Sequence, residues 1–314
     1  MNAQASPVLS PLRLTRTTLT LTLLTLTLLS SAAMANTSKG AALFKAGQYA
    51  QALTELTGPA HSGDRAAQSY LGQMYENGYG VKQDYVQAAS WYQKAATAGS
   101  TDGMNDLGQL YGYGQGVPYD SGKAVFWFRK AADAGSTAGI INLGTQYELG
   151  SGVPEDHKLA VSLYLKAARA GDTEGMFRLG LAYGDGMGVP QDYQKALSWH
   201  KQGAAAGNSK CMAQIAQMYT RAKGVQQDLA QADVWWRKAA DAGNAAAMGK
   251  LGQAYAQGQG VKQDSAQAAA WFLKGAQAGS KDSMEELIKL YTSGQGVPKD
   301  PAKAKYWQDK AGNN

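Results

Sequence analysis

The sequence predicts an all-α protein built as a solenoid, a stack of repeated helix pairs. The dipeptide Leu71-Gly72 returns at a spacing of 36 residues or a multiple of it. Its copies are Leu107-Gly108, Leu143-Gly144, Leu179-Gly180 and Leu251-Gly252. Within each unit, apolar residues recur at helical spacing, and capping residues and glycines mark the ends of two helices. A fixed period of this length is typical of repeats that share a continuous core with their neighbours.

The first 35 residues differ from the repeats. Arg13 and Arg16 precede a run of leucine and threonine, which ends in Ala-Met-Ala at residues 33–35. This pattern predicts a secretory signal peptide at residues 1–35, cleaved after Ala35. The alternative is an uncleaved membrane anchor, although the run is short for a bilayer span. After cleavage we expect a periplasmic or secreted protein with no stable membrane insertion.

Composition narrows the classes of partner. The chain has 30 basic and 24 acidic residues, and loss of Arg13 and Arg16 with the signal peptide lowers the net charge from +6 to +4. Because there is no dense Lys/Arg tract, we expect no nucleic-acid partner, while acidic partners or anionic polysaccharides stay open. Cys211 is the single cysteine, so stability must come from packing and capping rather than from an internal disulfide.

Residues 64–314 contain seven units, and the first helix of each, helix A, begins at a capping residue. These residues are Asp64, Ser100, Ser136, Asp172, Asn208, Asn244 and Ser280. Each has a side chain that can accept a hydrogen bond from free N–H groups at a helix start. We expect helix A to end at a glycine pair such as Gly78 and Gly80, because glycine readily adopts the left-handed conformation.

The second helix, helix B, follows an aspartate that occurs in all seven units. The aspartates are Asp84, Asp120, Asp156, Asp192, Asp228, Asp264 and Asp300. Capping explains both their position and their chemistry, and the alternative is a ladder of acids that binds cations or catalyses a reaction. We expect helix B to end at a glycine such as Gly99.

Aromatic residues form regular columns. Tyrosine recurs in helix A at Tyr75, Tyr111, Tyr147, Tyr183, Tyr219, Tyr255 and Tyr291. Tryptophan recurs in helix B at Trp91, Trp127, Trp199, Trp235, Trp271 and Trp307, with Leu163 as the exception. Their place beside invariant alanines such as Ala88 indicates core packing, and the alternative is a sugar-binding or base-stacking surface. Cys211 falls in a column of small residues, which predicts a buried side chain rather than a reactive thiol.

The pattern Ala-x-x-x-Leu-Gly-x-x-Tyr-x-x-Gly-x-Gly-Val-x-x-Asp-x-x-x-Ala-x-x-Trp-x-x-Lys-Ala-Ala-x-x-Gly, at residues 67–99, resembles the Sel1-like repeat family, which is related to tetratricopeptide repeats. The resemblance implies a right-handed superhelix of antiparallel helix pairs, with helix A on the concave side. It also implies an adaptor or regulator that binds other proteins. Exported bacterial members of the family act in envelope assembly, exopolysaccharide export, host contact or secretion-system immunity.

One branch of secreted relatives has a disulfide in each repeat and is associated with penicillin binding and weak β-lactam hydrolysis. This chain lacks those paired cysteines, and no catalytic residue transfers to it, so we expect no enzyme and no cofactor. A β-lactam-interacting hydrolase stays as the alternative from another class. His61, His157 and His200 fall in different columns with no partner at metal-ligand spacing, which predicts surface or packing roles and no metal site.

The end units resemble caps. Residues 36–63 resemble a shortened copy in which Pro59 would end the second helix. In the last unit, Lys305 occupies the column of Ala89, Val125, Val161 and Leu197, and Asp309 that of Leu165 and Leu273, and such polar replacement suits a helix with no following neighbour. We expect a monomer.

Two columns of helix A vary freely between units and are the candidate binding surface. The candidate residues are Tyr70, Asp106, Tyr113, Asn142, Arg178, Gln214, Arg221 and Lys250. Tyr70, Tyr113 and Arg178 are the best anchors, because tyrosine and arginine are enriched at interface hot spots. A solvated surface also explains the variation. The sequence therefore predicts an exported scaffold that binds a protein or peptide on its concave face, with an immunity-type or envelope and exopolysaccharide assembly factor as the alternative.

Overall fold

The computed structural model describes residues 34–312, and within this range every regular element is an α-helix. A helix covers residues 34–45, and the signal peptide predicted at residues 1–35 lies almost wholly outside the described range. The helices that follow are α2 (Tyr49–His61), α3 (Arg65–Asn77), α4 (Tyr85–Thr97), α5 (Thr101–Tyr113), α6 (Ser121–Asp133), α7 (Thr137–Leu149), α8 (His157–Arg169), α9 (Thr173–Asp185), α10 (Tyr193–Ala205), α11 (Ser209–Arg221), α12 (Leu229–Asp241), α13 (Ala245–Gln257), α14 (Ser265–Gln277), α15 (Lys281–Ser293) and α16 (Pro301–Gly312).

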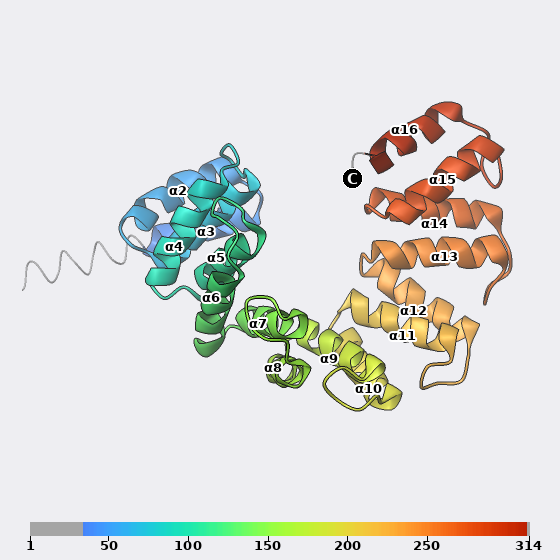
Figure 1. Cartoon of the computed structure of the whole chain (residues 1–314). Helices are drawn as coiled ribbons and strands as arrows, with labels where there is room; N and C mark the ends of the chain where they lie inside the picture. Colours follow the sequence, from blue (N-terminus) through green and yellow to red (C-terminus); the bar gives the residue numbers. More distant parts are fainter. Residues whose placement is uncertain (1–33, 313–314) are drawn as a thin grey trace, which may run out of the picture. The chain divides into compact units, whose positions relative to one another are not determined.

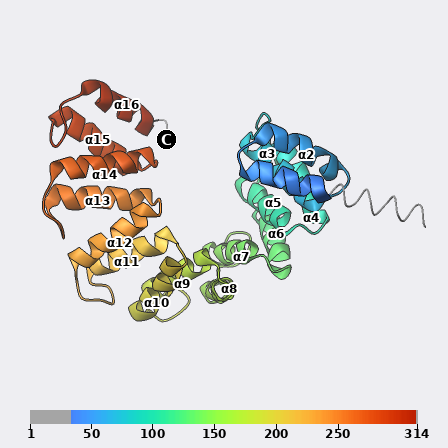
Figure 2. The same cartoon turned by 180° about the vertical axis from the view of Figure 1, so that it is seen from behind.

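The described residues form two compact units, which divide after Ala131. In the first unit α2 to α5 pack one on the next, and in the second α7 to α16 do the same (Figure 1). The view from behind shows the same order (Figure 2). Odd-numbered helices from α3 onward are helix A and even-numbered ones from α4 onward are helix B, so the fold is the predicted all-α repeat solenoid. Helix A of one repeat also touches helix A of the next at α9 with α11 and at α13 with α15.

The predicted caps are confirmed. In helix A, Ser100 Oγ accepts a hydrogen bond from the Gly103 N–H at 3.2 Å, and the six counterparts cap their helices in the same way. In helix B, Asp84 Oδ1 accepts from the Val86 and Gln87 N–H groups, and the other six aspartates accept equivalent bonds. The carboxylate of each aspartate therefore caps the helix that follows it.

The glycine turns do more than end helix A. The first glycine of the pair is the left-handed cap in six repeats, and in the fifth repeat Ala222 takes this place with φ 55°. At the second glycine, Gly188, a Cβ would lie 2.3 Å from the carbonyl oxygen of His157, at the start of the preceding helix B. The turn thus packs its backbone directly against the previous repeat, which leaves no room for a side chain.

The Leu-Gly dipeptide is where the two helices of one repeat pack closest together. A Cβ on Gly72 would lie 2.4 Å from Cδ1 of Tyr92, and Gly108 stands in the same relation to Phe128. The aromatic residue directly after the tryptophan position is therefore the one that packs into helix A. These residues are Tyr92, Phe128, Tyr164 and Phe272, each 3% exposed or less.

The tryptophan column is less buried than the sequence predicted. Trp91 and Trp307 are buried, but the other four tryptophans are half-buried at the edges of the core clusters. One residue is a rotation of about 100° around a helix, so only the next position points at the glycine of helix A. The prediction for Cys211 is confirmed, since its side chain is fully buried.

The prediction that Pro59 ends its helix is wrong. Pro59 is buried inside α2, which continues to His61. A proline disfavours the helical conformation of the residue before it in part through a clash with that residue's Cβ, and Gly58 has no Cβ. Within residues 34–312 we find no helix with the length and hydropathy needed to span a bilayer.

Candidate functional site

The candidate residues of the first unit lie on two helices, Tyr70 on α3 and Asp106 and Tyr113 on α5. Tyr70 is half-buried, and its ring lies 5.1 Å from that of Phe44, so much of its surface is used in packing. Tyr113, at the end of α5, is 75% exposed and is the most accessible aromatic candidate.

Asp106 is a partly buried acid. Burial is the main cause that raises its pKa to about 6, and the nearby charge of Glu76 adds to the effect, while a hydrogen bond from Asn105 opposes it. Glu76 in turn accepts a 2.6 Å hydrogen bond from the Tyr92 hydroxyl. Asp106 thus belongs to a polar cluster at the joint between α3, α4 and α5.

Arg178 is held by its own unit. Its Nε donates to Glu174 Oε1 at 3.0 Å, its Nη1 lies 3.7 Å from Glu148 Oε2, and the guanidinium lies 6.0 Å from the Tyr164 ring centre. Asn142 is half-buried on α7. Neither residue offers its polar group to solvent as freely as the column pattern suggested.

Gln214, Arg221 and Lys250 are brought together by two neighbouring cavities of the second unit. The first, which we call the His200 cavity, has a volume of about 210 Å³ and lies among α9, α10 and α11. The second, which we call the Asp233 cavity, has a volume of about 170 Å³ and lies among α11, α12 and α13. Gln217 and Arg221 line both cavities, so α11 is the wall between them. We call the surface of α9, α11 and α13 around these openings the A face.

At the His200 cavity, two residues are smaller than their counterparts in the first and third repeats. His200 occupies the column of Tyr92 and Tyr164, and Gly184 occupies the column of Glu76 and Glu148. In those two repeats the tyrosine hydroxyl donates to the glutamate. A shorter ring and a missing side chain leave space in the repeat of His200.

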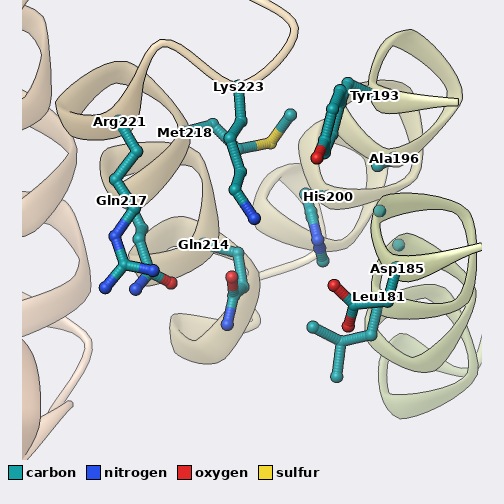
Figure 3. Close-up of a pocket in the computed structure, with 12 residues that line it drawn as sticks. Leu181, Asp185, Tyr193, Ala196, His200, Gln214, Gln217, Met218, Arg221 and Lys223 are labelled. Carbon is teal, nitrogen blue, oxygen red and sulfur yellow. The ribbon is translucent and has the colours of Figure 1, made fainter. Parts of the chain in front are cut away.

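His200 is buried and polar. Its Nδ1 has no hydrogen-bond partner, and burial lowers the pKa of the imidazole to about 4, so the ring is neutral at physiological pH. Figure 3 shows its ring facing the cavity, with Asp185 and Leu181 beside it and with Gln214, Arg221 and Lys223 across the opening. An unpaired buried nitrogen costs about 1–3 kcal/mol, which a ligand or water in the cavity can recover.

Asp233 gives the second cavity the same property. Its Oδ2 accepts a 2.7 Å hydrogen bond from Arg237 Nε, but its Oδ1 is buried without a partner. Its column elsewhere holds Ala89, Val125, Val161, Leu197 and Ala269, with Lys305 in the last unit. Each of the two neighbouring cavities is therefore lined by a helix B residue that has one buried, unsatisfied polar atom.

Sequence reasoning missed both residues. We expected His200 to be a surface or packing residue, and it is indeed buried, but no element satisfies its ring nitrogen. The detectable signal is a polar residue in a helix B column that is apolar or aromatic in the other internal repeats.

The arrangement suits binding of polar groups. Among residues 34–312 no three or more His, Cys, Asp or Glu side chains gather as metal ligands would. The two cavities present hydrogen-bonding groups at their floor and the cations Arg221, Lys223 and Lys250 at their walls. Such a surface recognises a ligand by charge and by hydrogen bonds.

Comparisons with known proteins agree with this fold. The Sel1 repeat model matches residues 65–100, 101–136, 137–172, 173–208, 209–244, 245–280 and 289–314. A Sel1 repeat protein from Oxalobacter formigenes is 34% identical with a TM-score of 0.63, and the match covers 90% of this chain and 86% of that one. No curated protein matches the chain significantly.

Two further structures are similar. The c5321 protein, a protective antigen of uropathogenic Escherichia coli strains with an SLR fold, is 33% identical with a TM-score of 0.63. The match covers 93% of this chain but 64% of that protein's length. The immunity protein Pa5087 from Pseudomonas aeruginosa shares the fold at 17% identity and a TM-score of 0.53, over 70% of this chain and 82% of that one. With seven matched repeats from residue 65 to residue 314, the chain belongs to the Sel1 repeat family.

Proposed function

We propose that the chain is an exported adaptor that binds a protein partner on the A face, and that it has no catalytic role. Sel1 repeats form scaffolds that are typical of protein-interaction modules. The observation that carries the proposal is the pair of neighbouring cavities, each with an unsatisfied buried polar group, at His200 and at Asp233. A protein that needed only a stable stack would keep these positions apolar, because unsatisfied buried polar groups are costly.

The test is site-specific photo-crosslinking in cells that express the protein. A photoreactive residue replaces Arg221 or Lys250 on the A face, or, as matched controls, the exposed helix B residues Ser162 or Ser198. We expect one protein to crosslink from the A-face positions and not from the controls. Crosslinking that is equal from both surfaces, or that comes only from helix B, would contradict the proposal.

Export has its own test. We expect the amino terminus of the protein recovered from the periplasm or medium to be Asn36, and retention of residues 1–35 in the membrane fraction would contradict cleavage.

A toxin or an assembly component of the envelope is the alternative identity of the partner. The immunity protein Pa5087 shares the fold at 17% identity, and this similarity does not identify the partner of the present chain.

A further inference from the structure

The cations around the two cavities have no anionic partner within the described residues. Arg221 and Lys223 line the His200 cavity, and neither forms an ion pair there. Lys223 lies 5.5 Å from the ring centre of Tyr193, and Lys250, in the Asp233 cavity, donates a hydrogen bond to the neutral Gln253. These three charges are therefore available to a ligand.

Two arginines of the second unit are already paired with acids. Arg178 pairs with Glu174, and Arg237 pairs with Asp233, the carboxylate of the second cavity. Asp185 is the one carboxylate among the residues that line the His200 cavity. The two openings thus carry an excess of positive charge, which favours an anionic ligand.

The floor of the His200 cavity adds a directional group. A neutral imidazole carries one N–H, and the ring of His200 lines this cavity with no hydrogen-bond partner at Nδ1. A carboxylate oxygen is the acceptor that forms the strongest hydrogen bond with such a donor. The volume of about 210 Å³ is room for an acidic side chain.

We propose that the His200 cavity binds the carboxylate of an aspartate or glutamate in an acidic segment of the partner protein. Arg221 and Lys223 supply the charge, and the imidazole of His200 supplies a hydrogen bond at the floor. The Asp233 cavity, with Arg221 and Lys250 on its wall, continues this surface toward the next residues of the same segment. The inference rests on the proposed function and names the chemistry of its partner.

The probe is a short fluorescein-labelled peptide with glutamates spaced by glycine and serine, and its reference is the same peptide with glutamine in place of each glutamate. Anisotropy titrations use the full mature chain. We expect the glutamate peptide to bind about tenfold more tightly or better, and to weaken as salt rises. Equal binding of the two peptides, or equal binding of free glutamate or inorganic phosphate, would overturn the inference.

Two variants separate the cavity from general surface charge. Arg221→Gln with Lys223→Gln removes the wall charges, and its matched control is Lys201→Gln with Lys262→Gln, which removes two exposed lysines that line neither cavity. His200→Phe keeps every charge and closes the floor with the residue that Phe128 and Phe272 provide in other repeats. We expect loss of the glutamate preference in the wall and floor variants and not in the control.

Two other results would contradict binding of the glutamate peptide in the His200 cavity. If His200→Phe binds as the wild type does, or if the control pair loses as much as the wall pair, the peptide is held by surface charge alone. Should His200→Phe fail to fold, the imidazole NMR signals of His200 in the wild type decide, since only the glutamate peptide should shift them. A partner that crosslinks at Arg221 while the two peptides bind equally would refute this inference and leave the proposed function standing.

Discussion

Gly180 has no Cβ, and the ring of His200 fills the space in which a Cβ would lie. A methyl group there would lie 2.2 Å from Cε1 of the imidazole. The same relation joins Gly108 to Phe128 and Gly252 to Phe272, so the Leu-Gly dipeptide is a socket for the aromatic residue of helix B. Two repeats lack this glycine and have Ala216 or Ile288 in its place. At the position of the His200 ring these repeats have Trp236 and Gln308, and neither side chain is buried.

Gly180→Ala should therefore destabilise the second unit by about 1–3 kcal/mol, because the added methyl overpacks the joint. His200→Phe should raise the melting temperature by a few degrees, since it removes an unpaired buried nitrogen and fills space. Thermal melts followed by circular dichroism measure both. A neutral Gly180→Ala variant would show that the socket is not tightly packed.

Ala222→Gly should stabilise the protein by about 1 kcal/mol. Ala222 has φ 55°, in the region that favours glycine, and glycine holds this position in the other six repeats. A change in the opposite direction at the second glycine of the turn, Gly188→Ala, should cost more than about 2 kcal/mol because its Cβ would also meet the His157 carbonyl. Denaturant titration compares the two, and equal effects of the same sign would contradict the turn geometry.

The first unit should lose stability between about pH 4 and pH 7 through Asp106. The folded state raises the pKa of Asp106 from 3.8 to about 6, so it favours the protonated acid. That contribution is complete below the unfolded pKa and disappears as pH rises through the folded value, with a size of at most about 3 kcal/mol.

Asp106→Asn should remove this slope, because the amide of asparagine does not titrate. Asn142 shows that asparagine is accepted in the same column. The measurement is urea unfolding of both proteins across the pH range, and the difference between them cancels the titration of other groups. Parallel curves for wild type and variant would mean that Asp106 is solvated.

Asp228→Ala should cost about 1 kcal/mol, whereas Asp228→Asn should be nearly neutral. The Oδ1 of Asp228 accepts a 2.9 Å hydrogen bond from the Gln231 N–H, and an asparagine oxygen can accept the same bond. Thermal unfolding distinguishes the two variants. If asparagine were as damaging as alanine, the charge rather than the cap would matter, and a role in binding cations would regain support.

Internal comparison of the repeats predicted the fold well. The caps at Ser100 and Asp84, the left-handed glycines and the burial of Cys211 are all local properties, and the structure confirms each of them. The depth of the tryptophan column was misjudged, since one residue along a helix changes which neighbour a ring faces. The variable columns of helix A did contain Gln214, Arg221 and Lys250, but they could not separate these from Arg178, whose guanidinium is held by glutamates of two helices.

The sequence by itself determined the repeat length, the helix pair and the ends of each helix, because capping and glycine conformation act within a few residues. Only the tertiary structure showed that His200 and Asp233 keep an unsatisfied polar atom and that each lines a cavity. The reason is physical: whether a polar atom is paired, and whether space is left beside it, depends on side chains from three helices at once. The glycine of the Leu-Gly dipeptide leaves space on helix A, and the helix B residue that fills this space decides whether the repeat is closely packed or has a cavity beside it.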